Sequence, residues 1–335
     1  MCDEQNSRWE RRSWPEFKRI CQSTPEAGIH YQSMLLRLTS PGTYIANNTA
    51  ECHIYRRDKD LSSDDYSPMD PLFSRDPWYK HIMDNYRELR PDEVLPGHDS
   101  GCEFGSACIN IGIYLPWLVS QCVKGGVVFK RAILNHISDA KSLSETSPKA
   151  DFVINCTGLG SKKLGGIEDG TMNPARGQTV LVRNTCHPMV TTSGTEDGPK
   201  EVLYIMQRAL GGGTILGGTY DIGNYDPVPD PAIGERIMKR AVELRPELAD
   251  GKGVEGLSIV RHAVGFRPYR SGGVRIEREK MDDDTWVVHN YGHAGWGYQG
   301  SYGCAERVVL LVNEIRKQKG EDIMSEPMLF SWDQR

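Results

Sequence analysis

The chain has 335 residues with a formal net charge of −5, and 38% of its residues are hydrophobic. This length is sufficient for two domains, and the negative net charge argues against a nucleic-acid-binding surface. No run of about 18 apolar residues occurs, which argues against a membrane-spanning helix. We therefore expect small soluble molecules as ligands, no nucleic acid and no membrane.

The N-terminus and the cysteines indicate an intracellular protein. The first residues contain no apolar core of the kind found in secretory signals. The nine cysteines form no CxxC pair, so we expect reduced, mostly buried thiols. The nine histidines show no metal-binding spacing, and no metal site is predicted.

The first predicted element is a helix near the N-terminus. Ser13-Trp14-Pro15-Glu16 has the spacing of a capping box with an early proline, so we expect the helix to begin there. Residues 40–100 are rich in Pro, Asp, Ser and Tyr, and we expect loops and short elements in them.

A helix followed by two strands is predicted next. Residues 110–124 show apolar residues at the spacing of one helix face, and Gly125-Gly126 ends the pattern. Residues 127–130 (VVFK) predict a strand. The almost wholly apolar run 151–156 and the glycine turn after it suit a buried parallel strand whose carboxyl end faces a ligand. The residues of the predicted helix face are Leu115, Leu118, Val119 and Cys122.

The middle of the chain predicts a different kind of sheet. Three β-rich runs separated by Gly and polar turns indicate a mostly antiparallel sheet: 178–183, 201–206 and 214–220. Asp230-Pro231 then caps a helix, and residues 274–279 and 286–290 return to strands.

The order of these pieces predicts the fold class. Parallel α/β segments at 105–160 and 285–319 flank the antiparallel block. We therefore expect an α/β protein with two domains, in which a discontinuous nucleotide-binding domain contains an inserted sheet domain.

Gly295, Gly297 and Gly300 have the GxGxxG spacing of a dinucleotide-binding loop. A strand-like run precedes them and a helix-like run follows. However, no second strand follows to complete a βαβ unit, and Glu314, the acidic residue at about the right distance, lies in the helix. The glycines alone are therefore weak evidence for a pyrophosphate site.

Three further features are candidates for chemistry. Arg267, in an apolar, proline-fixed context, would clamp a carboxylate, or is a surface or salt-bridged arginine. Tyr204 and Tyr220 lie on neighbouring runs and would face one cavity, or are half-buried sheet tyrosines. Cys156-Thr157-Gly158 would present backbone amides to a ligand, or is an ordinary turn.

The sequence contains no recognisable catalytic side-chain set. It lacks a plausible Ser-His-Asp group, a Cys-His signature, a Walker loop and paired catalytic carboxylates. An arginine, tyrosines and glycines offer no general base, so we predict no catalytic side chain and a reaction carried out by a cofactor.

Five segments that occur in order together resemble the flavin-dependent D-amino acid oxidases, the fungal members above all. They are residues 155–166, 175–183, 216–226, 260–279 and 287–306. Residues 8–20 and 75–89 also look like this family, so the resemblance covers most of the chain.

The resemblance implies FAD as the cofactor and a D-amino acid and O2 as substrates. Arg267 would hold the substrate α-carboxylate, and Tyr220 and Tyr204 would help to orient the substrate. The Gly295 carbonyl would accept a hydrogen bond from the substrate amine, with Gln299 near the pocket. Family members transfer the α-hydrogen to the flavin, which yields a 2-oxo acid, ammonia and, after reoxidation by oxygen, hydrogen peroxide.

The resemblance also implies which residues contact FAD. Gly295-x-Gly297-x-x-Gly300 would let the backbone run close to the flavin ring rather than bind pyrophosphate, and the helix after it would direct its positive end at the flavin. The implied contacts are Leu134, Cys156, Thr157, Gly158, Gly265, His293, Ala294, Gly295, Trp296, Gly297, Tyr298 and Gln299.

Tyr220 favours neutral D-amino acids as substrates. The related oxidase of acidic D-amino acids tends to carry a basic residue at this position, and without one a second carboxylate lacks a cationic partner. Arg208 lies close by in the sequence and would supply such a charge, so a D-aspartate oxidase or related amine oxidase stays an alternative.

The chain departs from the family pattern in two places. The family opens with a βαβ unit that bears GxGxxG and cradles the pyrophosphate, a unit of ~30 residues or more, and this chain begins at the helix that comes later. We therefore expect an N-terminally truncated FAD domain, and a remnant that no longer holds FAD is a second alternative. Residues 34–52 interrupt a segment that is more direct in relatives, and a retained intron with a mis-called start is our hypothesis for both departures.

We predict that residues 1–33, 97–183 and 265–323 form the FAD-binding domain, residues 34–96 and 184–264 the substrate-binding domain, and residues 324–335 a tail. The last residues are not a peroxisomal signal, so the sequence favours the cytosol over the peroxisome. Whether the chain forms a homodimer is left open by the sequence.

Overall fold

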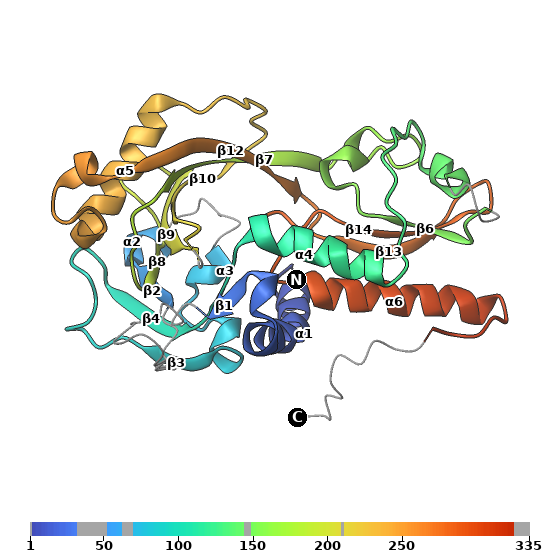
Figure 1. The fold of residues 1–335 in the computed structure, drawn as a ribbon, viewed down its shortest axis with the longest axis horizontal. Coiled ribbons are helices and arrows are strands. Elements are labelled where there is room, and N and C mark those ends of the chain that lie inside the picture. The colour runs from blue at the N-terminus through green and yellow to red at the C-terminus, as the bar shows by residue number, and fades with distance from the viewer. Residues whose placement is uncertain (1, 32–51, 62–69, 144–148, 209–210, 325–335) are drawn as a thin grey trace.

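The computed structural model describes residues 2–31, 52–61, 70–143, 149–208 and 211–324 (Figure 1). Apart from Cys52, the predicted interruption at 34–52 lies outside these residues, as does the tail beyond Met324. The shorter helices and strands are β1 (Ile29–Tyr31), β5 (Ala107–Ile109), α2 (Asp58–Leu61) and α3 (Asp70–Phe73).

A mostly antiparallel sheet dominates the described residues. Its strand order is β11-β7-β10-β9-β8-β2-β4-β3, and β12 pairs with β7. The pair β2 and β8 is parallel, and the other pairs are antiparallel, which confirms the predicted sheet type. The strands are β2 (Cys52–Arg56), β3 (Asp84–Glu88), β4 (Ser100–Gly105), β7 (Met172–Val182), β8 (Met189–Thr192), β9 (Glu201–Gln207), β10 (Thr214–Thr219), β11 (Asp221–Ile222) and β12 (Ile259–Arg270).

The helix α5 (Pro231–Leu244) covers one end of this sheet. Asp230 caps it as predicted, because its carboxylate accepts from the Ala232 amide at 2.8 Å. Ile237 is fully buried against the core residues Val180, Ile205 and Leu216. The alternation of apolar residues along β7, β9 and β10 therefore builds the largest core cluster of the described chain.

A smaller sheet contains β13 (Arg275–Lys280), β14 (Trp286–Tyr291) and β6 (Phe152–Asn155). β6 runs parallel to β14, as the sequence predicts. The helix α6 (Ser301–Gln318) packs Leu311 and Ile315 against Val288. The long strands β7 and β12 reach from the large sheet toward this smaller one (Figure 1).

The strand predicted at residues 127–130 is wrong. These residues have no regular secondary structure, and Val128 is 87% exposed. A strand needs a hydrogen-bonding neighbour. Within the described chain the edge strand β6 pairs with β14 alone, so residues 127–130 do not pair with it.

The helix α1 (Cys2–Ser23) begins earlier than the capping box predicts, so Ser13 lies inside it. The Ser13 hydroxyl donates to the Trp9 carbonyl at 2.8 Å and accepts from the Gly303 amide at 2.9 Å. A Cβ at Gly303 would overlap the Trp9 backbone. Ser13 and Gly303 therefore serve the close packing of α1 on α6 rather than a helix cap.

The helix α4 (Ile111–Lys124) forms and ends at Gly125 as predicted, but its apolar residues surround it on all sides. Tyr114 is buried. Leu115 and Val119, predicted to be on the buried face, are each 44% exposed. With Ile111 and Val123 they form an exposed row, which we call the α4 stripe.

Candidate active site

Arg267 is held on β12, opposite Ala175 of β7. Its Nη1 donates to the Thr219 carbonyl at 3.1 Å, and its guanidinium lies 4.9 Å from the centre of the Tyr220 ring. A Cβ at Gly177 would overlap this guanidinium, so the absence of a side chain at Gly177 makes the room for it. Among the described residues no carboxylate pairs with Arg267, so they give no support to the alternative of a salt-bridged arginine.

Tyr204 reaches the same place from β9. Its ring lies against Gly217 of β10, where a Cβ would overlap the ring carbons. Burial raises the pKa of the Tyr204 hydroxyl, and the nearby positive charge of Arg267 opposes that rise. The structure therefore brings both predicted tyrosines, Tyr204 and Tyr220, to Arg267, but both are buried and neither lines the two cavities described below, contrary to the expectation that they face one cavity.

The loop before α6 is tied to the strand that carries Arg267. The Ala294 amide donates to the Pro268 carbonyl at 2.9 Å, and His293 forms an isolated antiparallel β-bridge with Tyr269. A Cβ at Gly295 would stand 3.8 Å from the Cδ of Arg267, so the loop backbone passes beside the arginine.

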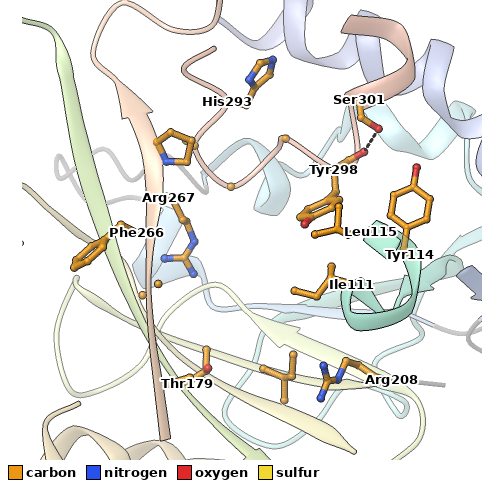
Figure 2. A pocket seen from close by; sticks show the side chains of 18 of the residues that line it. Ile111, Tyr114, Leu115, Thr179, Arg208, Phe266, Arg267, His293, Tyr298 and Ser301 are labelled. Atoms are coloured by element: carbon orange, nitrogen blue, oxygen red, sulfur yellow. Dashed lines mark hydrogen bonds between the residues drawn. The ribbon is translucent and has the colours of Figure 1, made fainter. Parts of the chain in front are cut away.

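A cavity of about 980 Å³ opens in front of Arg267. Six of the predicted cofactor contacts line it: Gly265 of β12, and His293, Ala294, Gly295, Gly297 and Tyr298 of the loop before α6. Ile111 and Leu115 of the α4 stripe line the opposite side (Figure 2). The exposed stripe therefore supplies one apolar wall of the site.

A second cavity of about 320 Å³ adjoins the first, because Ile111, Arg208 and Ile215 line both. Trp296 and Gln299, also predicted to contact the cofactor, line this second cavity. Most of its remaining wall is apolar and includes Phe104 and Met206.

His293 has an unpartnered nitrogen at the large cavity. Its Nε2 is buried without a hydrogen-bond partner among the described residues. Burial lowers the pKa of His293 to about 4, so the ring is neutral at pH 7. A neutral imidazole with such a low pKa is a weak base and a free hydrogen-bonding group for a ligand.

The predicted turn after β6 lies close to β12 but outside the lining of both cavities. A Cβ at Gly158 would stand 3.7 Å from Pro268. The Thr157 amide donates to the Asn155 side chain at 3.1 Å, so it is already satisfied within the turn. Leu134 packs against the cluster around Ile137 and also lines neither cavity.

Sequence reasoning missed the buried network behind this turn. His289 is fully buried, its Nδ1 lies 3.2 Å from Asn155 Nδ2, and its Nε2 lies 3.0 Å from Glu279. Burial lowers the pKa of His289. A neutral His289 that donates to Glu279 accepts from the Asn155 amide, which leaves the Asn155 oxygen for Thr157. The only signal was the parallel pairing of the two strands, which places Asn155 opposite His289.

Two kinds of site find no support in the described residues. No group of three or more His, Cys, Asp and Glu side chains is arranged to hold a metal ion. None of the described helices combines the length and the apolar character that a membrane span requires.

Comparison with known proteins gives a family match over most of the chain. The family model described as FAD dependent oxidoreductase matches residues 3–311. The chain is 58% identical over 318 residues to the D-amino-acid oxidase of Fusarium vanettenii, covering 95% of this chain and 83% of that protein. It is 34% identical over 321 residues to the D-amino-acid oxidase of Schizosaccharomyces pombe, covering 94% of this chain and 81% of that protein.

More distant similarities show the fold. The glycine oxidase of Geobacillus kaustophilus matches with a TM-score of 0.59 at 15% identity, over 95% of this chain and 79% of that one. The L-proline dehydrogenase of P. horikoshii matches with a TM-score of 0.62 at 14% identity, over 96% of this chain and 85% of that one. These structures confirm the predicted fold class.

Proposed function

The chain belongs to the family of FAD dependent oxidoreductases, and on that premise we propose that it oxidises D-amino acids with neutral side chains. FAD-dependent oxidation of D-amino acids follows from its similarity to the D-amino-acid oxidases. The preference for neutral side chains is the finer part of the proposal. The observation that carries the assignment is Arg267, an arginine without a described carboxylate partner at the wall of a large cavity.

The residues around the large cavity suit a flavin ring. The loop offers bare backbone at Gly295 and Gly297, and α4 offers the apolar side chains Ile111 and Leu115. The buried Nε2 of His293 lacks a partner that a polar edge of the ring would supply. When bound, FAD supplies the acceptor for the two electrons and the α-hydrogen of the substrate.

The protein's own groups bind and orient the substrate. The planar guanidinium of Arg267 matches the α-carboxylate, and its bond to Thr219 and stacking on Tyr220 keep it in one orientation. Tyr204 lies beside it, in a ring position that Gly217 permits. The Gly295 carbonyl stays our candidate acceptor for the substrate amine.

No side chain at the cavity is needed as a base. The lining contains His293, whose pKa is lowered to about 4 by burial, and Tyr298, whose pKa is raised by burial. Neither group exchanges a proton readily near pH 7. This agrees with binding and orientation as the main tasks of the side chains.

The adjoining cavity supports the neutral preference. Its wall is dominated by apolar side chains such as Phe104, Met206 and Ile215, which favour an uncharged substrate side chain. One relative, the D-aspartate oxidase of Talaromyces thermophilus, is 30% identical over 324 residues, covering 96% of this chain and 77% of that protein.

Release of hydrogen peroxide by the chain with FAD tests the proposal. We expect peroxide from D-methionine and D-alanine, less from D-aspartate, and none from L-methionine. A flavin absorbance spectrum taken first decides whether the chain holds FAD. Faster turnover of D-aspartate than of D-alanine would contradict the neutral preference, and failure to take up FAD would support the alternative of an inactive remnant. The cytosolic location and a homodimer remain predictions.

A further inference from the structure

The loop between β14 and α6 is held at its start by a buried tyrosine. Tyr291, the last residue of β14, is 1% exposed, and its hydroxyl donates to Asp169 Oδ2 at 2.9 Å. Arg270, the last residue of β12, donates from its Nε to the same oxygen at 2.8 Å. Asp169 therefore joins the C-terminal ends of two strands that belong to different sheets.

Asp169 is a buried carboxylate that stays charged. Its side chain is 7% exposed, and its Oδ1 accepts from the Thr171 amide at 3.0 Å. Burial acts to raise the pKa of Asp169, but its hydrogen bonds, the largest of them from Arg270, outweigh burial and lower the pKa. A buried charge is stable only while its donors are present. The Tyr291 hydroxyl is therefore one of the groups that keep this junction together.

The loop follows a path that its own residues do not favour. Ala294 has a φ of 48°, in the left-handed region that is unfavourable for a residue with a side chain. Gly292 has a φ of 87°, and a Cβ there would stand 2.9 Å from the Cβ of Arg270, so the arginine packs directly on the loop backbone. The loop therefore keeps its path because neighbouring groups hold it.

The Tyr291 hydroxyl also reaches the network behind the turn after β6. It accepts from Arg275 Nη1 at 2.9 Å, and Arg275 Nη2 donates to Glu279 at 2.8 Å. Glu279 is also the partner of His289, which contacts Asn155. One chain of hydrogen bonds thus runs from the turn after β6 to the end of β12, and the Tyr291 hydroxyl is its junction.

This junction lies close to both groups that we assign to the substrate. Arg270 is three residues from Arg267 on β12, and Tyr291 is four residues before Gly295. The bond from Tyr291 to Asp169 and the bond from Asp169 to Arg270 therefore fix the start of the loop relative to the strand of Arg267. In the proposed function, Arg267 holds the α-carboxylate and the Gly295 carbonyl accepts from the α-amine, so their spacing has to match one amino acid.

We propose that Tyr291 and Asp169 are positioning residues that set the distance between Gly295 and Arg267. The inference rests on the proposed function, since it takes these two groups as the holders of the substrate. Neither Tyr291 nor Asp169 lines the large cavity or the one that adjoins it, so both act through the loop and not by touching the substrate.

The first test compares Tyr291→Phe with wild type in the FAD-loaded chain. Without the hydroxyl, Arg267 still holds a carboxylate, but the loop is no longer fixed beside it. We expect the rate at which D-methionine reduces the flavin without oxygen to fall by about tenfold. The dissociation constant of pentanoate, a carboxylate without an amine, should change by less than about twofold when followed by flavin absorbance. An unchanged rate of reduction, or equal changes in both quantities, would overturn the inference.

Tyr55→Phe is the matched control. Tyr55 is a strand tyrosine that is 3% exposed, its hydroxyl lies 3.1 Å from His53 Nδ1, and it lines neither cavity. The change should shift the urea midpoint about as much as Tyr291→Phe does and leave the rate of flavin reduction unchanged. If Tyr55→Phe slows the reduction as much as Tyr291→Phe, the effect comes from stability alone and the inference is wrong.

Asp169→Asn tests the same contact from its other side, and covers the case in which Tyr291→Phe fails to fold. The amide keeps one oxygen that accepts a hydrogen bond but loses the charge, so we expect flavin reduction to slow by about fivefold. In the double variant the rate should be about that of Tyr291→Phe alone, because both changes break one contact. Losses that multiply in the double variant would contradict a shared role.

Hydrogen exchange of the FAD-free chain separates this inference from the proposed function. In wild type the Ala294 amide is bonded to the Pro268 carbonyl. Tyr291→Phe should speed the exchange of residues 292–300 by about tenfold and leave residues 178–183 of β7 unchanged. Turnover of D-methionine by wild type together with unchanged loop exchange in the variant removes the inference alone. If wild type with bound FAD releases no peroxide from any D-amino acid, the proposed function fails and the positioning role fails with it.

Discussion

The large sheet and the segment after α4 differ in how fully their apolar residues are buried. In the large sheet, Val180, Ile205 and Leu216 are completely buried under α5. Beside the small sheet, the segment after α4 leaves Val128 and Ile133 at 87% and 93% exposure. The cavity lies between these regions, with Arg267 on the first side and the α4 stripe on the second. The substrate-binding side is therefore tightly packed. The apolar side chains of the α4 stripe and of the segment after α4 are largely exposed, so they contribute little to the free energy of folding.

The largest effect is expected at the packed side, from Arg267→Met. Loss of the guanidinium removes the group that pairs with the α-carboxylate, and kcat/KM for D-methionine should fall by about 1,000-fold or more. Urea unfolding should change little, since Arg267 has no ion pair among the described residues. A fall in kcat/KM of less than about tenfold would contradict a role of Arg267 in binding the substrate.

Paired substitutions in the two regions test the difference in packing directly. Ile205→Ala opens a cavity under α5 and should lower the free energy of unfolding by about 2–5 kcal/mol. Ile133→Ala removes a side chain that is 93% exposed and should change it by less than about 0.5 kcal/mol. Urea titrations followed by circular dichroism measure both values. Equal losses would contradict the contrast between the regions.

His293, between the two regions, predicts a dependence of stability on pH. Its folded pKa is lowered from 6.5 to about 4, so between these values the unfolded chain binds more protons than the folded one. Stability should therefore fall as the pH drops from about 6.5 to about 4, by up to about 3 kcal/mol from this residue. The difference between wild type and His293→Gln in urea unfolding at pH 7 and pH 5 isolates this contribution. A pH-independent difference would contradict the burial of a neutral ring.

Gly177→Ala is expected to have the smallest effect on the packed side. The added Cβ overlaps the Arg267 guanidinium, which must shift away from its bond to Thr219. We expect KM for D-methionine to rise about tenfold with a smaller change in kcat. Gly170→Ala, where a Cβ meets no atom within 4 Å, is the control and should leave KM unchanged.

Much of the local structure could be predicted because its causes are local. The β-rich runs became β7, β9, β10, β13 and β14, and Asp230 became the cap of α5. The predictions failed where the local structure depends on a segment packed beside it. Residues 127–130 have strand composition but no strand beside them in the described chain, and Ser13 serves a helix crossing instead of a cap.

The candidate site divides in the same way. The resemblance indicated Arg267, Tyr204 and Tyr220 together, and the structure brings these three side chains to one place. It did not indicate Gly177 or Gly217, because the space that these glycines provide exists only when β7, β10 and their partners are in register. The sequence also could not predict that Leu134 and the Thr157 amide lie away from the cavities.

The sequence by itself determined the family, the sheet type and the residue kinds that hold an amino acid, because motifs, alternation and glycine turns are local properties of the chain. Only the tertiary structure decided which charges are paired. Arg57 pairs with Glu196, which is far away along the chain, whereas Arg208 has no carboxylate within reach among the described residues. Ion pairing depends on distances between segments far apart along the chain, and those distances arise only when the strands are packed.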